Sequence, residues 1–268
     1  MRPVIPIISL ATALVLVVFE QGAAQTVDER LWVTDGAVLA AVVSGGTIYI
    51  GGSFGHVGPV TGGGVPFDAA SGAPPASFPK VTGMVLAVAP DGSGGWYIGG
   101  GFTHVGGVPR SNLAHLASDL SVSSWNPNAD SWISVLAVSG STVYAGGAFS
   151  SIGGEARNSI AALDARAGTA TAWDPNASGG VPFPYVTALA VSGSTVYAGG
   201  EFTSIGGEPR NYIAALDATT GTATAWNPNA NESVSDLTVG GPIVYATGYF
   251  TNIGGEPRNR IAALDATT

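Results

Sequence analysis

Arginine and tryptophan recur at regular positions along this chain, and they are the residue types best suited to recognising a ligand. The arginines follow a Gly-Gly step in phrases such as "IGGEPRN", and the tryptophans open phrases such as "WNPNA". Both types are enriched where proteins bind partners tightly, and tryptophan beside amide side chains also suits sugars. The candidate binding residues are Arg110, Arg157, Arg210, Arg258, Trp125, Trp173, Trp226 and Asn229.

A structural role for the same residues stays open, and the sequence favours it. A buried tryptophan removes about 200 Å² from water, worth roughly 5 kcal/mol as an upper value, so one per repeat would hold neighbouring units together. The arginines would then bond the carbonyl or carboxylate oxygens of neighbouring segments.

Other motifs that could support chemistry have simpler explanations. "GGSFG" (51–55) matches the G-x-S-x-G pattern of esterases, which needs a sharp strand-to-helix turn, but its serine is replaced in every other repeat. His56 and His104 occupy equivalent positions, but no third metal ligand accompanies them. The oxygen-rich stretches 91–95 and 174–180 fit turns better than calcium loops. We therefore predict no catalytic residue, no metal site and no cofactor.

Composition limits the function classes. The net charge is −9 with one lysine, so the clustered basic residues that track phosphates are missing and nucleic acid is not an expected partner. The chain has no cysteine, which rules out disulfides and thiolate sites. Forty glycines with only 10% charged residues favour strands and turns. We expect a monomer.

Residues 1–24 have the layout of a secretory signal peptide. Arg2 precedes an apolar run over 4–19, and small residues lead to a cleavage point before Gln25. The mature chain, 25–268, would then work outside the cell or in the periplasm. An uncleaved anchor is the alternative, and no membrane span is expected after signal cleavage.

The mature chain consists of five copies of one unit. Each copy has a strand ending in a Gly-rich step and a phenylalanine, and the intervals between these anchors are 48, 47, 53 and 48 residues. The longest interval contains the insertion "GGVPFPY" (179–185). The anchors are Phe54, Phe102, Phe149, Phe202 and Phe250.

Each unit is predicted to contain four short strands. In the fourth copy these are 186–191, 195–202, 211–217 and 222–226, bounded by Gly, Pro, Asn and Asp. A repeated four-stranded meander of this length is typical of a β-propeller blade, so the sequence predicts an all-β propeller of five four-stranded antiparallel blades. An open solenoid is the main alternative.

The fifth copy lacks its fourth strand, and a matching strand stands at the start of the mature chain. In "ERLWV" (29–33), Trp32 precedes Tyr49 by 17 residues, close to the 19 that separate Trp226 from Tyr245. We predict that this segment pairs with the last blade, closes the ring and removes two open sheet edges. The alternative is that the chain is a fragment of a larger propeller.

Connections in a meander alternate between the two ends of the sheet. The arginine-bearing loop between second and third strands should therefore share one rim with the connection that carries tryptophan and Asn229. The opposite rim has only short turns. If the protein binds a carbohydrate or a protein, we expect the ligand at the loop-bearing rim.

The unit at 196–230, "VYAGGEFTSIGGEPRNYIAALDATTGTATAWNPNA", resembles the bacterial delta-sixty type repeat of large secreted propeller proteins. The resemblance covers the mature chain and implies an extracytoplasmic propeller without a general catalytic activity. The diglycine also looks kelch-like. "ALDATTGTATAW" is similar to the tryptophan-docking repeat of quinoproteins, but Trp226 falls one residue late, on the opposite strand face.

These observations predict a secreted, non-catalytic repeat scaffold for binding or adhesion. One alternative is an extracellular enzyme acting on a polysaccharide or small molecule at the propeller axis, which would need unrepeated acids or histidines converging there. The other is a structural segment of a longer adhesin.

Overall fold

The computed structural model describes residues 34–55, 63–72 and 78–267, and within these ranges all regular elements are β-strands. The predicted signal peptide (1–24), the predicted closing segment (29–33) and His56 lie outside the described residues. No helix that could cross a membrane occurs in the described part of the chain.

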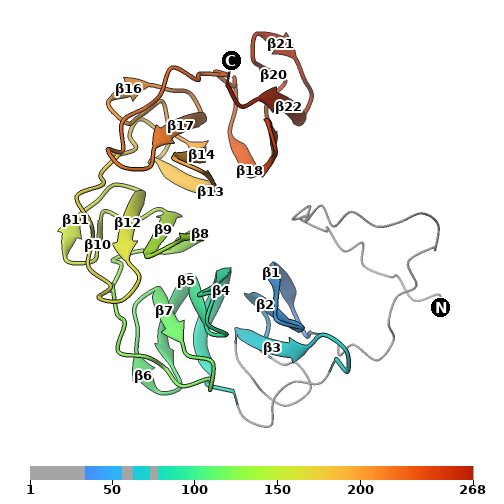
Figure 1. Ribbon diagram of the computed structural model, residues 1–268, viewed down its shortest axis with the longest axis vertical. Helices are drawn as coiled ribbons and strands as arrows, with labels where there is room; N and C mark the ends of the chain where they lie inside the picture. The colour runs from blue at the N-terminus through green and yellow to red at the C-terminus, as the bar shows by residue number, and fades with distance from the viewer. Residues whose placement is uncertain (1–33, 56–62, 73–77, 268) are drawn as a thin grey trace, which may run out of the picture.

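The strands form five main antiparallel sheets that follow one another along an arc, from blue to red in Figure 1. Sheet 1 holds β1 (Ala37–Ser44), β2 (Thr47–Ser53) and β3 (Gly64–Asp68), and sheet 2 holds β4 (Val81–Pro90), β5 (Trp96–Val105), β6 (Val108–Pro109) and β7 (Leu113–Leu116). Sheet 3 holds β8 (Ile133–Ser139), β9 (Thr142–Gly147) and β12 (Ile160–Asp164). Sheet 4 holds β13 (Tyr185–Ser192), β14 (Thr195–Glu201) and β17 (Ile213–Asp217), and sheet 5 holds β18 (Val234–Gly240), β19 (Ile243–Gly248) and β22 (Ile261–Asp265).

The loop between the second and third strands folds back as a small hairpin. In sheets 3 to 5 it forms a separate two-stranded ribbon, and in sheet 2 it continues β5 into β6. The ribbons are β10 (Ser151–Ile152) with β11 (Glu155–Ala156), β15 (Ser204–Ile205) with β16 (Glu208–Pro209), and β20 (Asn252–Ile253) with β21 (Glu256–Pro257).

The predicted four-stranded unit is wrong, because the predicted fourth strand is reduced to a single bridge. In sheet 4 that bridge joins Ala223 to Leu216 of β17. The amide of Ala223 donates to the carbonyl of Gly206 in the hairpin at 2.9 Å. The guanidinium of Arg210 in the same hairpin donates to the carbonyl of Thr224. The segment is therefore shared between β17 and the hairpin and cannot extend a ladder along β17. Sheets 2 and 3 have the same single bridge.

Consecutive sheets pack face to face through a branched side chain seated on a glycine. The Cγ1 atom of Val186 in β13 lies 2.7 Å from where a Cβ on Gly146 of β9 would stand, so no side chain fits there. Sheets 1 and 2, 2 and 3, and 4 and 5 repeat this contact, which we call the glycine joint. Its other pairs are Gly51 with Val85, Gly99 with Ile133, and Gly199 with Val234.

The first strands of the sheets lie side by side on the inner side of the arc (Figure 1). Each of them contains a β-bulge, for instance between Val186 and Ala188 of β13 and between Val234 and Asp236 of β18. A bulge leaves one residue without a partner on the neighbouring strand and bends the strand. The bulged residues consequently line the axis of the arc.

The arc is open between sheets 1 and 5 within the described residues (Figure 1). Val38 of β1 is 44% exposed, whereas the equivalent Val186 is fully buried by the preceding sheet. Ile261 of β22 is 64% exposed, whereas the equivalent Ile213 is fully buried by the following sheet. Each end of the arc thus presents apolar side chains that the inner sheets bury.

Candidate functional site

The recurring arginines hold each hairpin to the segment after the third strand. The Nη1 group of Arg210 donates to the carbonyl of Pro209 at 2.8 Å, and its Nη2 group donates to that of Thr224 at 2.7 Å. Arg110 and Arg157 form the equivalent pairs of bonds. Arg258 forms the first bond, and no described residue accepts the second. These guanidinium groups therefore stabilise the loops by hydrogen bonds to backbone carbonyls within the protein.

The recurring tryptophans connect each sheet to the next. Trp173 is only 4% exposed, and its indole Nε1 donates to the carbonyl of Asp217 in sheet 4 at 2.9 Å. Its ring meets Tyr144 edge to face, with centroids 5.2 Å apart. Trp125 and Trp226 are equally buried and donate to Asp164 and Asp265 in the same way. Their rings contribute packing between sheets rather than exposed surface.

Asn229 lies in the turn that leads from sheet 4 to sheet 5. Its backbone is left-handed, with φ of 49°, and its side-chain oxygen accepts a hydrogen bond from Asn211 at 2.7 Å. In the same turn, the carbonyl of Pro228 accepts from the amide of Gly254 at 2.6 Å. The connection that follows one repeat therefore touches the hairpin of the next, and both lie at the same end of the sheets.

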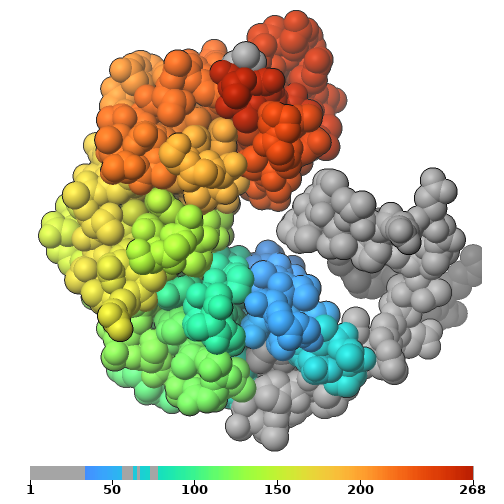
Figure 2. All heavy atoms as spheres, viewed as in Figure 1, coloured from blue at the N-terminus to red at the C-terminus, as the bar shows by residue number. Residues whose placement is uncertain are grey.

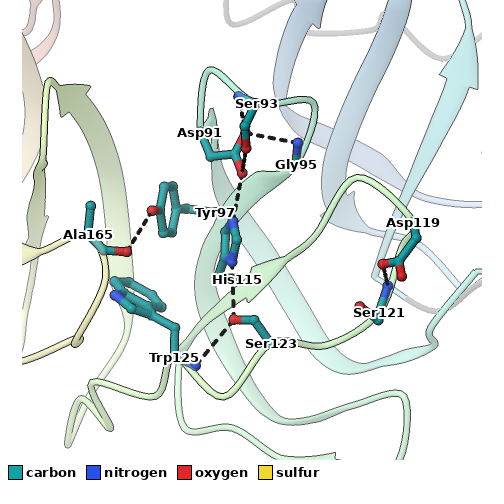
Figure 3. A network of polar contacts seen from close by, with 10 residues as sticks. All are labelled: Asp91, Ser93, Gly95, Tyr97, His115, Asp119, Ser121, Ser123, Trp125 and Ala165. Atoms are coloured by element: carbon teal, nitrogen blue, oxygen red, sulfur yellow. Dashed lines mark hydrogen bonds and ion pairs between the residues drawn. The ribbon is translucent and has the colours of Figure 1, made fainter.

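A hydroxyl, an imidazole and a carboxylate form a chain in sheet 2 that the sequence analysis missed (Figure 3). His115 Nδ1 lies 3.1 Å from Ser123 Oγ, and its Nε2 lies 2.9 Å from Asp91 Oδ2. This order of groups occurs in acyl-transfer enzymes. Here, however, Ser123 Oγ also accepts the amide of Trp125, as Thr171 Oγ1 does for Trp173 in sheet 3. These hydrogen bonds have a structural role: through His115 they connect the turn that holds Asp91 to the segment after β7.

These hydrogen bonds make a pH-dependent contribution to stability. Burial raises the pKa of Asp91, but hydrogen bonds from Ser93, His115 and Gly95 together outweigh burial, and the net pKa lies below the usual value. Because the pKa of Asp91 is lower in the folded than in the unfolded protein, its ionised carboxylate stabilises the fold fully at pH values above the unfolded-state pKa of ~3.9. This stabilisation is lost as the pH falls through the folded-state pKa. We expect Asp91→Asn to be less stable than the parent protein at neutral pH and to lose less stability on acidification. Urea denaturation between about pH 6 and pH 3 measures both, and parallel stability curves would contradict the prediction.

Exposed aromatic side chains gather at the loop-bearing rim of sheets 3 to 5. Trp132 directly precedes β8, Phe183 lies in the insertion before β13, and Tyr249 directly follows β19. They are 47%, 48% and 63% exposed. Starts of first strands and ends of second strands lie at the same end of these antiparallel sheets. We call these three residues the aromatic arc; the sequence analysis missed it because no ring recurs in all repeats at any of the three positions.

Two carboxylates accompany the aromatic arc at sheets 4 and 5. Burial raises the pKa of Glu201, and the negative charge of Glu232 raises it further. The pKa values of Tyr185 and Tyr212 are also raised, first by burial and then by the same two carboxylates. The rim therefore combines exposed rings with hydrogen-bond acceptors, a combination that can hold a hydroxyl-rich ligand.

A pocket of about 520 Å³ lies at the axis, lined by residues from all five sheets. Its described lining contributes one carboxylate, that of Asp236, and one guanidinium, that of Arg260. Arg260 lies over the ring of Tyr249, with its guanidinium carbon 5.9 Å from the ring centroid. The pair of carboxylates that glycoside hydrolysis requires is not found among these lining residues.

Residues 90–122 match a family model described as a domain of unknown function with a β-propeller fold, DUF5122. Among solved structures, the chain is similar to the computationally designed Ika8 protein, with 14% identity and a TM-score of 0.53 over 83% of this chain and 60% of the designed one. It also matches the designed Ika4 protein, with 13% identity and a TM-score of 0.44 over 70% of this chain and 95% of that one. No curated protein matches the chain. The repeated antiparallel sheets and the family match together support a β-propeller repeat scaffold.

Proposed function

We propose that this protein is a secreted, non-catalytic scaffold that binds carbohydrate through the aromatic arc. The observation that carries the proposal is the position of Trp132, Phe183 and Tyr249, three exposed rings on one rim. The fold does not require a ring at these places: Ala37, Met84 and Ser233 stand at the position of Trp132 in three other repeats, and only sheet 4 has a second ring there, Tyr185. Secretion rests on the signal-like sequence 1–24.

The chemistry of the rim suits a sugar chain. Aromatic faces pack against the C–H surfaces of sugar rings, while carboxylates accept hydrogen bonds from hydroxyl groups. Glu201 and Glu232 stand beside the rings at sheets 4 and 5. The recurring arginines and tryptophans stabilise the loops of this rim, because their side chains donate hydrogen bonds to backbone carbonyls of neighbouring segments. Asn229 remains exposed at the same rim.

The test is a screen of the secreted protein against glycan arrays and insoluble cell-wall polysaccharides. We expect Trp132→Ala and Tyr249→Ala each to weaken binding by about tenfold or more, since central aromatic anchors contribute most of the affinity. Val43→Ala is the matched control, because Val43 is 66% exposed beside the short turn between β1 and β2. A screen without any bound polysaccharide, or binding that survives both substitutions, would overturn the proposal.

Hydrolysis of the bound polysaccharide is a second candidate. Burial, and then the neighbouring negative charge of Glu232, raise the pKa of Glu201, and a raised pKa is what the acid of a two-carboxylate site requires. If the rim cleaves glycosidic bonds, Glu201→Gln should abolish release of reducing ends and leave binding intact. Absence of release from every bound polysaccharide would remove this candidate.

We also propose that the five sheets form a closed ring, with segment 29–33 pairing with β22. The support is the match between the two exposed ends at Val38 and Ile261, together with the single Arg258 bond that lacks its counterpart. The alternatives are further sheets beyond these ends, in a larger propeller or a longer adhesin.

Arginine substitutions test the closure. Arg210→Met should lower the free energy of unfolding by about 1–2 kcal/mol, since its bonds to two carbonyls are lost. If segment 29–33 supplies the missing carbonyl, Arg258→Met should cost about as much, as measured by urea denaturation. A much smaller effect at Arg258 would argue against closure by this segment.

A further inference from the structure

The axial pocket has one apolar and one polar wall. Its walls are set by the bulged residue of each first strand, which faces the axis (Figure 2 shows the sheets curving around this central hollow). Sheets 1 and 2 place leucine there, and sheets 3 to 5 place a hydroxyl residue. The five residues are Leu39, Leu86, Ser134, Thr187 and Ser235.

Sheet 5 departs from the other sheets at two positions in this pocket. Asp236 stands at the position of Ala87 and Ala188, and Thr247 stands at the glycine of the glycine joint. One oxygen of Asp236 accepts the amide of Leu237 at 2.8 Å, and the carboxylate is open to the pocket. Partial burial raises the pKa of Asp236, although the side chain remains exposed to the pocket.

The charged groups around the pocket favour a cation. Asp236 and Arg260 both line it, yet they form no ion pair with each other, and Arg260 stacks on Tyr249 at the mouth. On the neighbouring rim, the negative charges of Glu201 and Glu232 lie close enough to Tyr185 to raise its pKa. Inside the pocket, an anion would meet the carboxylate of Asp236.

We propose that the axial pocket binds a small amphipathic cation, an ammonium group carrying an alkyl or aryl chain. The ammonium pairs with Asp236 and is hydrogen-bonded by the neighbouring hydroxyl groups, and the chain packs on Leu39 and Leu86. A volume of about 520 Å³ lies within the usual range of small-molecule sites. This site is separate from the carbohydrate surface, because its lining shares only Tyr249 with the aromatic arc.

The test compares three probes with one chain length and different head groups: n-hexylammonium, n-hexanol and hexanoate. Binding to the intact protein is followed by NMR titration at neutral pH. We expect n-hexylammonium to bind at least tenfold more tightly than n-hexanol, and hexanoate to bind most weakly. Equal affinities for hexylammonium and hexanol would overturn the proposal.

Asp236→Ala is the decisive variant, because Ala87 and Ala188 show that the first strand accommodates alanine at this position. It should reduce the affinity for hexylammonium to that for hexanol while leaving Tm unchanged. Asp119→Ala, which removes an exposed turn carboxylate in sheet 2, is the matched control and should bind as the parent protein does. Retention of hexylammonium binding by Asp236→Ala would contradict the proposed site.

Discussion

Trp173→Ala is expected to lower the free energy of unfolding by about 3–5 kcal/mol, the usual cost of truncating a buried tryptophan. The substitution removes a ring that is 4% exposed between sheets 3 and 4 and leaves a cavity against Tyr144. It also removes the indole bond to the carbonyl of Asp217. Because that carbonyl lies in the neighbouring sheet, the loss weakens the contact between sheets as well as the packing within one.

Chemical denaturation of the parent and variant proteins measures this loss, provided that both unfold in one transition. The control is Trp132→Ala, which truncates a tryptophan that is 47% exposed in sheet 3. It should change the free energy of unfolding by less than about 0.5 kcal/mol, as surface substitutions usually do. Similar losses for the two variants would show that Trp173 does not hold the sheets together.

Gly146→Val is expected to destabilise the protein by about 3 kcal/mol or more, at the upper end of overpacking costs. A Cβ at position 146 would lie 2.7 Å from Cγ1 of Val135 and 2.7 Å from Cγ1 of Val186. The first of these atoms belongs to the same sheet and the second to the next, so neither can retreat without disturbing a packed strand. The joint between sheets 3 and 4 has to open.

Yield of soluble protein, Tm and denaturation midpoint report this effect. Gly101→Val in β5 is the matched control, since a Cβ at Gly101 meets no atom within 4 Å and valine favours strands. That variant should keep the parent's stability to within about 0.5 kcal/mol. If Gly146→Val were tolerated equally well, close packing at the glycine joint would not be what sets the spacing of the sheets.

The strands of each repeat could be predicted because their signals are local. The predicted range 195–202 differs by one residue from β14, and 186–191 lies inside β13. The turn after β17 also forms as expected, with Asp217 accepting the amides of Thr219 and Thr220. Alternating strand residues and turn residues determine these elements without reference to the rest of the chain.

Features that depend on competition between distant partners could not be predicted. The segment 222–226 has the pattern of a strand, yet its backbone groups are divided between β17 and the hairpin that carries Arg210. The pairing of His115 with Asp91 likewise joins residues that no local pattern connects. The aromatic arc and Asp236 were detectable only as departures from the repeat, at positions where the other copies differ.

Sheets 1 to 4 each contribute a glycine on which the next sheet packs, and sheets 2 to 5 each contribute the valine or isoleucine that packs on it. The surfaces are interchangeable between repeats, so duplication or deletion of one whole copy in the gene leaves every new junction already matched. Evolution can therefore lengthen or shorten such a chain in single steps of about 48 residues. Thr247 stands at the receiving position of sheet 5, so a sheet that packs there makes a different contact from the four glycine joints.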